Sequence, residues 1–284
     1  MKDRESTFEQ EVAQGLRFEF GKNWAQFLKL LNDERIERAT QGLSELLCGE
    51  NLRGKTFLDV GSGSGLSSLA AWRLGATVTS FDYDPSSVGC TQELHRRYAQ
   101  NDDSRWKVER GSALDKVYLC HLGQFDVVYS WGVLHHTGQM WNALENMIPL
   151  VKPDGLLAVA IYNDQGITSR AWLKIKQTYC SGWLGRAAMS AICIPYFVAK
   201  GVAYDIVTLT NPVKRYRESG ARGMSLVRDW FDWIGGLPFE VAKPEQILKL
   251  YRRRGYELVN LSTVAGNVGC NEFLFRAGAP GAHS

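Results

Sequence analysis

The chain has 284 residues, of which 45% are hydrophobic and 22% are charged, and its net charge is +3 at pH 7. This hydrophobic content is ample for a packed core and excludes a largely disordered chain. The small net charge gives no argument for nucleic acid by itself. The six cysteines include no Cys-x-x-Cys pair, so the sequence offers no zinc spacing. The N-terminus is charged from its second residue and has no apolar signal core, so we expect a cytoplasmic protein with reduced thiols.

Helical and strand patterns follow one another along the first half of the chain. Residues 8–48 predict two or three amphipathic helices. The expected strands then cover 56–60, 77–81, 106–109, 125–130 and 156–162, with helices over 66–74, from Pro85 onward and over 140–151, and a turn at 152–155. This alternation indicates a parallel sheet with helices on both faces.

The pattern changes after residue 162. No strand is predicted between 163 and 243, where helices are expected over 170–179, 186–209 and 225–233. A segment of this length is too long for a connecting loop. A helix over 244–253 and strands over 257–262 and 272–276 follow. The prediction is therefore an α/β fold, a doubly wound Rossmann-like sheet of seven mostly parallel strands. It divides into N-terminal helices (1–54), a core (55–162), a helical cap inserted after the fifth strand (163–243), elements completing the core (244–276) and a flexible tail (277–284).

One segment of the cap requires a membrane check. Residues 187–199 carry no charge, but Pro195 interrupts them and they fall short of the roughly 20 apolar residues that a span needs. We expect a buried or pocket-lining helix here and no membrane span.

Three glycines at alternate positions follow the first strand: Gly61, Gly63 and Gly65. In a doubly wound sheet this turn approaches the cofactor, and glycines remove side chains that would block it. The dinucleotide fingerprint places its third glycine where this chain has Leu66, and no Gly-Lys-Ser/Thr follows for a nucleoside triphosphate. Asp82, at the end of the second strand, is positioned to accept the ribose hydroxyls of any adenosine cofactor.

Asp59 lies two residues before the first glycine. A carboxylate there is unfavourable for a pyrophosphate but suits a cofactor with a positive amino group and a sulfonium. Together with the motifs around it, this turn resembles the class I S-adenosylmethionine-dependent methyltransferases. The motifs are LDVGSGSG at 58–65, FDYDP at 81–85, FDVVYS at 125–130, LHH at 134–136 and VKPDG at 151–155. The resemblance covers about residues 55–162 and the last helix and strands.

The resemblance implies S-adenosylmethionine as cofactor and a role for individual residues. Asp59 and the glycine backbone would hold the methionine part, Asp82 the ribose, and Tyr83 one face of the adenine. The other implied contacts are Ser62 in the turn, Ser112 and Ala113 after the third strand, Ser130 and Trp131 after the fourth, and Lys22 and Trp24 of an N-terminal lid. Ser112 also fits a helix cap, and Lys22 and Trp24 also fit a solvated charge and a core aromatic.

His135 and His136 follow the fourth strand, at the edge where the family presents the methyl group. Histidine titrates in the range that a general base requires, and two adjacent residues of an extended segment cannot both face a pocket. His136 is the candidate base, with His135 beside it; the alternative is a histidine that shapes the loop. Some relatives hold magnesium with glutamates near this position, where this chain has Gly132 and His135, so no metal is expected.

The range of possible methyl acceptors can be narrowed by excluding classes of substrate. The segment Ser130–Val133 lacks the Asn/Asp-Pro-Pro-aromatic motif of base amino-methylation, and no cysteine nucleophile lies near it, so nucleic acid is disfavoured. We expect O- or N-methylation of a small or medium-sized, partly apolar molecule, such as a metabolite, a quinone precursor or a glycan unit. Candidate acceptor contacts are Tyr162, Asn163, Glu240 and Asn271, each of which also has an ordinary structural explanation. The alternatives are an RNA or protein methyltransferase, a silent S-adenosylmethionine-binding protein and a nicotinamide-dependent oxidoreductase. The oligomeric state stays open.

Overall fold

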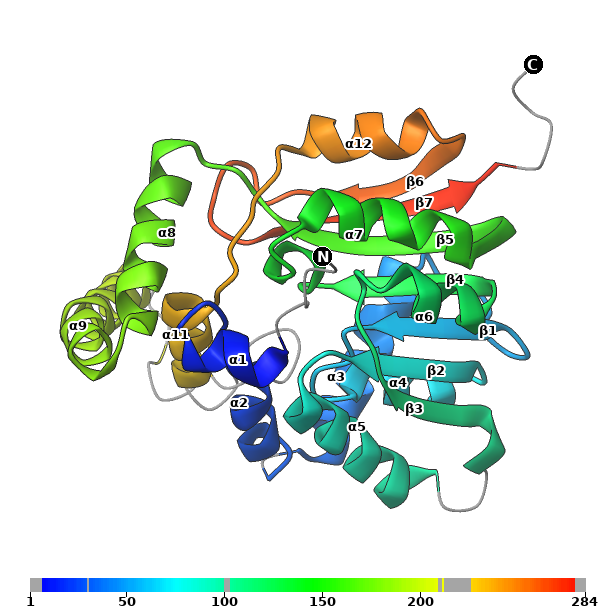
Figure 1. Ribbon diagram of the computed structural model, residues 1–284, viewed down its shortest axis with the longest axis horizontal. Helices are drawn as coiled ribbons and strands as arrows, with labels where there is room; N and C mark the ends of the chain where they lie inside the picture. The colour runs from blue at the N-terminus through cyan, green and yellow to red at the C-terminus, as the bar shows by residue number, and fades with distance from the viewer. Residues whose placement is uncertain (1–6, 30, 100–102, 209–210, 212–225, 279–284) are drawn as a thin grey trace, which may run out of the picture.

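The computed structural model describes residues 7–29, 31–99, 103–208, 211 and 226–278. One seven-stranded sheet has the order β3-β2-β1-β4-β5-β7-β6, in which β7 runs antiparallel to the other six strands (Figure 1). The strands are β1 (Thr56–Val60), β2 (Thr77–Asp82), β3 (Trp106–Arg110), β4 (Phe125–Trp131), β5 (Val151–Tyr162), β6 (Tyr256–Ser262) and β7 (Cys270–Ala277). This confirms the predicted fold class.

Helices cover both faces of the sheet (Figure 1). They are α1 (Phe8–Ala13), α2 (Phe20–Phe27), α3 (Asp33–Leu46), α4 (Leu66–Arg73), α5 (Pro85–Tyr98), α6 (Lys116–Leu122), α7 (Met140–Met147), α8 (Ile167–Cys180), α9 (Trp183–Thr208), α11 (Leu226–Gly235) and α12 (Pro244–Arg252). Alternate residues of the central strands enter opposite cores, as the two-residue period of a strand requires. Leu58 and Val128 pack with α7 and α12, whereas Phe57 and Val127 pack with α3, α4 and α5.

Two local predictions need correction. The turn expected at 152–155 lies inside β5, because the register jumps from Phe125 opposite Val151 to Val127 opposite Leu156. The extra residues form a bulge, with Asp154 in the left-handed region at φ 59°. The helix α6 was not predicted; it begins after Asp115, whose carboxylate accepts hydrogen bonds from the N–H groups of its first turn.

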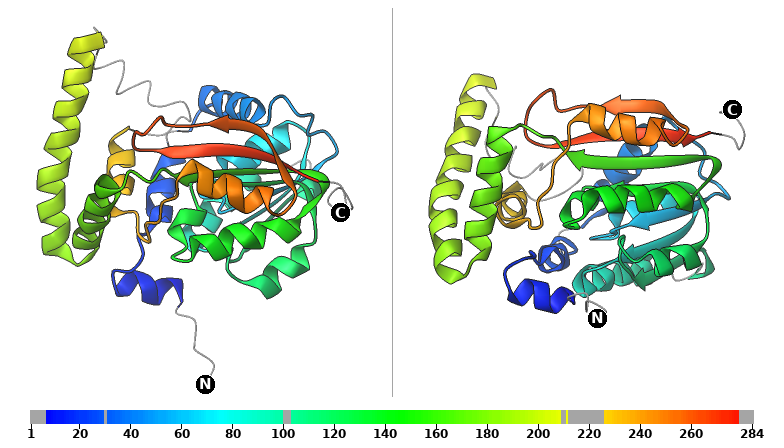
Figure 2. Two further views of the ribbon diagram at one scale, coloured as in Figure 1. Left: turned by 90° about the horizontal axis from the view of Figure 1, so that it is seen from above. Right: turned by 45° about the horizontal axis from the view of Figure 1, so that its top comes forward.

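The cap helices α8, α9 and α11 stand beyond the end of β5 and share a small core around Tyr179, Cys193 and Ile234 (Figure 1). The expectation that the 187–199 segment would be buried or would line a pocket was wrong. Helix α9 runs through Pro195 without a break, and only Cys193, Gly201 and Asp205 of its 26 residues are buried. The reason is that α8 and α11 cover one side of α9 and leave the rest as the outer surface of the cap (Figure 2). Among the described residues, α9 is the one helix whose length and composition would suffice to cross a membrane.

The N-terminal segment lies over the glycine-rich turn. The Gly21 N–H, in the first turn of α2, donates to Asp84 Oδ2 at 2.8 Å, at the start of α5. A Cβ atom at Gly21 would lie 2.5 Å from Ser86 Cβ, so the two helices meet backbone to backbone. Further along α2, the Trp24 indole faces the turn, 3.1 Å from where a Cβ on Gly63 would stand. Helix α2 is therefore held against the turn by a contact that only glycine permits.

This contact makes a test of the N-terminal segment. We expect Gly21→Ala to displace α2 from α5 and to weaken binding of S-adenosylhomocysteine, the demethylated form of the cofactor that the resemblance implies, by about tenfold or more, because a lost charge-assisted hydrogen bond costs about 1.5–3 kcal/mol. The matched control is Gly89→Ala, an exposed position of α5 with nothing within 4 Å, which should raise helix stability and leave binding unchanged. Equal affinity of the two variants, measured by calorimetry, would show that the docking of α2 does not matter for the cofactor.

Candidate cofactor and acceptor site

A cavity of about 1240 Å³ opens at the carboxyl ends of β1 and β4. These neighbouring strands mark the point where the strand order reverses, the usual ligand site of a doubly wound sheet. The volume exceeds the roughly 300–1,000 Å³ of an ordinary ligand pocket. The cavity therefore has room for a cofactor and a second molecule.

The glycine-rich turn forms the floor of this cavity. Gly61 and Gly63 adopt φ values of 79° and 54°, which side chains other than glycine rarely tolerate. A Cβ at Gly61 would overlap the Val133 side chain at 2.3 Å. Ser62 lies between them in the wall, whereas Gly65 stands behind it, with Thr91 2.8 Å from its missing Cβ. Gly61 and Gly63 thus let the turn pack closely against Val133 and Trp24 while it lines the cavity, and Gly65 serves the packing of α4 on α5.

Asp59 is held from behind by a chain of buried hydrogen bonds. Trp106 Nε1 donates to Ser80 Oγ at 2.9 Å, Ser80 Oγ lies 2.7 Å from Ser68 Oγ, and Ser68 Oγ donates to Asp59 Oδ2 at 2.5 Å. An indole N–H can only donate and a carboxylate can only accept, so every hydroxyl in the chain points towards Asp59. The chain, together with the Ser68 backbone hydrogen bond, orients the carboxylate at the cavity wall.

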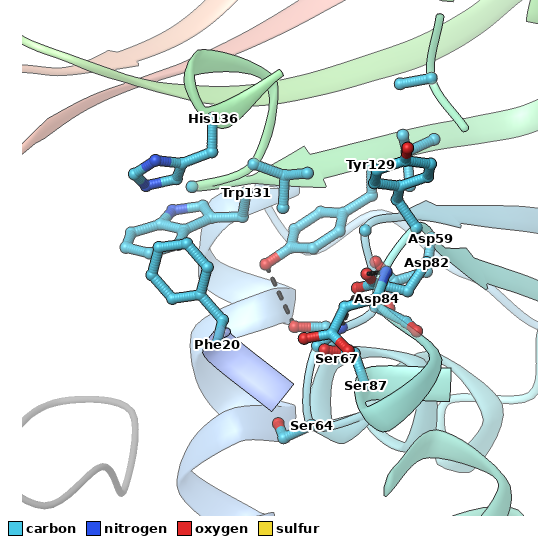
Figure 3. Close-up of a pocket in the computed structure, with 18 of the residues that line it drawn as sticks. Phe20, Asp59, Ser64, Ser67, Asp82, Asp84, Ser87, Tyr129, Trp131 and His136 are labelled. Atoms are coloured by element: carbon cyan, nitrogen blue, oxygen red, sulfur yellow. Dashed lines mark hydrogen bonds between the residues drawn. The ribbon is translucent and has the colours of Figure 1, made fainter. Parts of the chain in front are cut away.

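Two carboxylates share the cavity wall (Figure 3). Burial, opposed by the Ser68 hydrogen bond and reinforced by repulsion from Asp82, raises the pKa of Asp59 to about 7. Burial also raises the pKa of Asp82 to about 6, although its carboxylate accepts hydrogen bonds from the Gly63 and Asp84 N–H groups, each at 2.9 Å. An acidic pair of this kind, with Asp59 buried and Asp82 partly exposed to the cavity, favours a ligand that brings positive charge and hydroxyl donors.

The predicted adenine contacts lie along the same wall. Tyr83, Ser112 and Ala113 line the cavity. The Tyr83 ring packs edge-on against Phe8 of α1, with centroids 5.6 Å apart, and the Arg17 guanidinium lies over it at 5.0 Å. Ser112 Oγ accepts a hydrogen bond from the Leu114 N–H at 3.2 Å, so it also shapes its own turn. The N-terminal segment and the carboxyl ends of β2 and β3 therefore enclose this part of the cavity.

Two other predicted cofactor contacts lie outside the cavity wall. Lys22 is 67% exposed and forms an ion pair with Glu19 at 2.7 Å, because the side of α2 that carries it faces solvent. Ser130 is fully buried and donates to the Val60 carbonyl at 3.0 Å, which joins β4 to β1. Trp131 does line the cavity, and its Nε1 donates to Glu272 at 2.8 Å.

Only one of the two histidines reaches the cavity, as expected for adjacent residues. His136 Nδ1 lies 2.6 Å from the Pro238 carbonyl, which can only accept, so Nδ1 carries the proton and Nε2 presents a lone pair. Burial lowers the pKa of His136 to about 3, so the expectation that it titrates near neutral pH was wrong. His135 is fully buried, stacks on Tyr162 at 3.8 Å and accepts a hydrogen bond from the Tyr162 N–H; it supports the wall.

The structure redistributes the predicted acceptor contacts. Tyr162 lines the cavity. Glu240 instead accepts hydrogen bonds from the Met140 N–H at the start of α7, at 3.0 and 3.2 Å, which stabilises the helix N-terminus. Asn163 and Asn271 are hydrogen-bonded to each other at 3.1 Å and line a separate cavity of about 270 Å³. These three side chains do not line the large cavity, and loop position alone does not show which way a side chain points.

Several wall residues were not predicted. They are aromatic or acidic and come from segments far apart in the sequence: Phe18, Phe20, Tyr129, Trp233 and Glu272. Glu272 was missed by one position, since neighbouring residues of a strand face opposite sides and Asn271 was chosen instead. Figure 3 shows Phe20, Trp131 and His136 together on one side of the cavity and Asp59, Asp82 and Asp84 on the other. One half of the site is therefore acidic and glycine-lined, and the other is aromatic.

The raised pKa of Asp59 predicts how the stability of the protein depends on pH. A folded-state pKa above the unfolded value means that stability is lost as the pH rises through the folded pKa. Between about pH 4 and about pH 8, we expect Asp59→Asn to gain on the order of 2–4 kcal/mol in free energy of unfolding relative to the wild type. Denaturant titrations at both pH values measure this. A stability difference that does not change with pH would refute the buried, ionising carboxylate.

The hydroxyl chain behind Asp59 predicts a graded series. Ser68→Ala removes the donor to Asp59 and leaves the Ser80 hydroxyl without its acceptor, so S-adenosylhomocysteine affinity should fall by about 5- to 30-fold, the equivalent of about 1–2 kcal/mol. Ser80→Ala, one step further away, should have a smaller effect. If both variants bind like the wild type in calorimetry, the chain does not orient Asp59.

The arrangement fits the cofactor implied by the sequence, because the glycine-rich turn lines the cavity and the Asp59 and Asp82 carboxylates beside it can bind a positive group and hydroxyl donors. A family model described as a methyltransferase domain matches residues 31–205. The ubiquinone biosynthesis O-methyltransferase of Schizosaccharomyces pombe, a mitochondrial protein by its name, is 30% identical over 151 residues, 50% of this chain and 52% of that protein. The chain thus spans about half the length of the curated relatives it matches.

Solved structures share the fold at low sequence identity. Magnesium protoporphyrin IX methyltransferase from Synechocystis, with bound S-adenosylhomocysteine, aligns at a TM-score of 0.50 and 12% identity over 97% of this chain and 90% of that one. The cyclase SpnF aligns at a TM-score of 0.52 and 14% identity, over 85% and 80% of the two chains. The family match, the sheet order and the glycine-rich turn agree. The chain belongs to the class I S-adenosylmethionine-dependent methyltransferases, and S-adenosylmethionine is its cofactor.

Proposed function

We propose that the protein transfers a methyl group from S-adenosylmethionine to a hydroxyl group of a small or medium-sized, partly apolar acceptor, with a quinone precursor as the favoured class. The observation that carries this proposal is one continuous cavity with an acidic, glycine-lined half and an aromatic half. When bound, the cofactor supplies an electrophilic methyl group on a sulfonium. The task of this chain is to hold that group and the acceptor oxygen in line.

The acidic half suits the cofactor. Asp82 accepts hydrogen bonds from the Gly63, Asp84 and Tyr83 backbone, and its remaining lone-pair capacity suits a ribose hydroxyl. The Asp59 carboxylate lies at the cavity wall, where it suits the positive amino end, and Gly61 and Gly63 of the turn line the same half. The N-terminal helix α2, docked through Gly21, closes this half from above.

The aromatic half suits a flat, apolar acceptor. Phe18, Phe20, Tyr162 and Trp233 contribute rings to the wall from the N-terminal segment, β5 and the cap. Its polar groups include two that accept hydrogen bonds, the His136 Nε2 lone pair and the Glu272 carboxylate, and these favour an acceptor that donates a proton. A phenolic ring meets both requirements, and the O-methyltransferase names of the relatives support oxygen over nitrogen.

His136 is proposed to orient the acceptor hydroxyl. Its Nδ1–H bond to Pro238 fixes the tautomer that exposes Nε2, and the packing of Phe20 against the ring, with centroids 4.8 Å apart, fixes its plane. A pKa of about 3 keeps the imidazole neutral, and the positive sulfonium lowers the pKa further. The residue therefore accepts a hydrogen bond well but is a poor base, so the hydroxyl proton would pass to water as the oxygen–methyl bond forms and the sulfur–methyl bond breaks, and S-adenosylhomocysteine would leave as the product.

Alternative functions can be distinguished from this one by experiment. The likeness to a cyclase shows that this fold also carries other chemistry, so a protein that binds the cofactor without methyl transfer is the second candidate. RNA and protein acceptors gain no support from the aromatic half of the cavity. The cytoplasmic location stays a prediction, because one relative carries a mitochondrial name.

The test is a methyl-transfer assay with isotopically labelled S-adenosylmethionine and three acceptors. These are a catechol with an apolar chain, the corresponding aniline and bulk RNA, with label detected by mass spectrometry. We expect label on the catechol oxygen and none in the other two, with Asp82→Ala strongly impaired at limiting cofactor. Label on the aniline nitrogen or in RNA, or binding without any transfer, would overturn the proposal.

For His136 we expect a loss of rate without a loss of cofactor binding. His136→Asn is too short to keep both the Pro238 contact and an acceptor contact, so kcat should fall by about 10- to 100-fold while cofactor affinity changes little. At saturating cofactor the wild-type rate should show no acid limb near the ordinary histidine pKa of about 6.5. An acid limb there that disappears in His136→Asn would instead show that His136 takes up the proton.

A further inference from the structure

The outer surface of α9 carries large apolar side chains along its whole length. Trp183, Leu184, Ile192, Tyr196, Ile206 and Val207 are each more than half exposed. Exposed apolar residues that are scattered singly need no explanation, but a series of them on one helix marks an interaction surface. Helix α9 is also the outermost element of the cap in both views of Figure 2.

The inner side of α9 is already satisfied by the cap. The Phe197 ring lies parallel to Trp172 of α8 at 6.0 Å and stacks near Trp230 of α11 at 5.6 Å. Cys193, Gly201 and Asp205 are buried on the same helix. A bilayer span would require these contacts to break, so a helix lying along a surface fits the structure better than one crossing it.

The exposed charged residues of α8 and α9 indicate what kind of surface α9 binds. They are Arg170, Lys174, Arg186 and Lys200, all basic, while the acidic residue of these helices, Asp205, is buried. A second copy of the chain docking face to face would bring like charges together. Anionic lipid headgroups attract them instead. Trp183 and Tyr204, near the two ends of α9, belong to the residue types that prefer the boundary between lipid and water.

We propose that α9 docks the cap on the surface of an anionic lipid bilayer. The outer apolar side chains enter the headgroup boundary, and the basic side chains contact the lipid phosphates. The cap helix α11 contributes Trp233 to the cavity wall and packs against α9, so the acceptor half of the cavity lies on the side of the molecule that faces the lipid. This inference goes beyond the proposed function, since it does not depend on the group that is methylated.

Vesicle flotation with the full chain tests the proposal. The probes are vesicles of phosphatidylcholine alone and of an equal mixture of phosphatidylcholine and phosphatidylglycerol. We expect the protein to float with the mixed vesicles, less with the neutral ones, and to be released by high salt. Ile192→Glu should reduce the bound fraction by about tenfold, because it places a like charge against the anionic lipid.

The matched control is Val117→Glu, an equally exposed apolar residue on α6, far from the cap. It should float like the wild type, and both variants should bind S-adenosylhomocysteine normally, which shows that they are folded. Absence of flotation, or equal flotation of the two variants, would overturn the proposal. So would a dimer in light scattering without vesicles that Ile192→Glu dissociates, because a second copy would then cover α9.

Discussion

The buried carboxylate of Asp59 is the feature on which the site depends. It is 2% exposed, and burial raises its pKa to about 7 despite the hydroxyl chain from Trp106 through Ser80 and Ser68. An ionised group in this position destabilises the ligand-free fold at neutral pH, and a cation bound beside it removes that cost. The position is therefore unfavourable for folding alone and favourable for a cofactor with a positive charge at this end.

Several other parts of the structure form the site around the Asp59 carboxylate. The Gly61 and Gly63 backbone conformations bring a ligand close to it, and α2 covers the turn through a contact that needs Gly21. The opposite half of the same cavity is built from rings of the N-terminal segment, β5 and the cap. Three segments distant in sequence thus meet at one strand switch point, which explains how a common core acquires a particular acceptor site. The exposed face of α9 forms the outer surface of the same cap.

The sequence predicts best what depends on neighbours along the chain. The sheet and the glycine-rich turn follow from strand periodicity and local conformation, and Asp59 and Asp82 lie at strand ends that the topology brings together. Glu240 was missed as a helix-capping group because Met140, which it binds, lies a hundred residues away. The low pKa of His136 and the direction of Glu272 depend on burial and strand facing in the folded protein, which residue type alone does not reveal. The exposure of α9 was missed because an uncharged helix has the same composition inside a core or on a surface.

The most direct test of the central claim is to count the protons that S-adenosylhomocysteine displaces. Calorimetric titrations near neutral pH in buffers with different ionisation heats give this number. With a pKa of about 7 in the ligand-free protein, Asp59 is partly protonated, so binding should release about half a proton, and Asp59→Asn should release much less. Proton uptake by the wild type, or equal proton release by both proteins, would contradict the account.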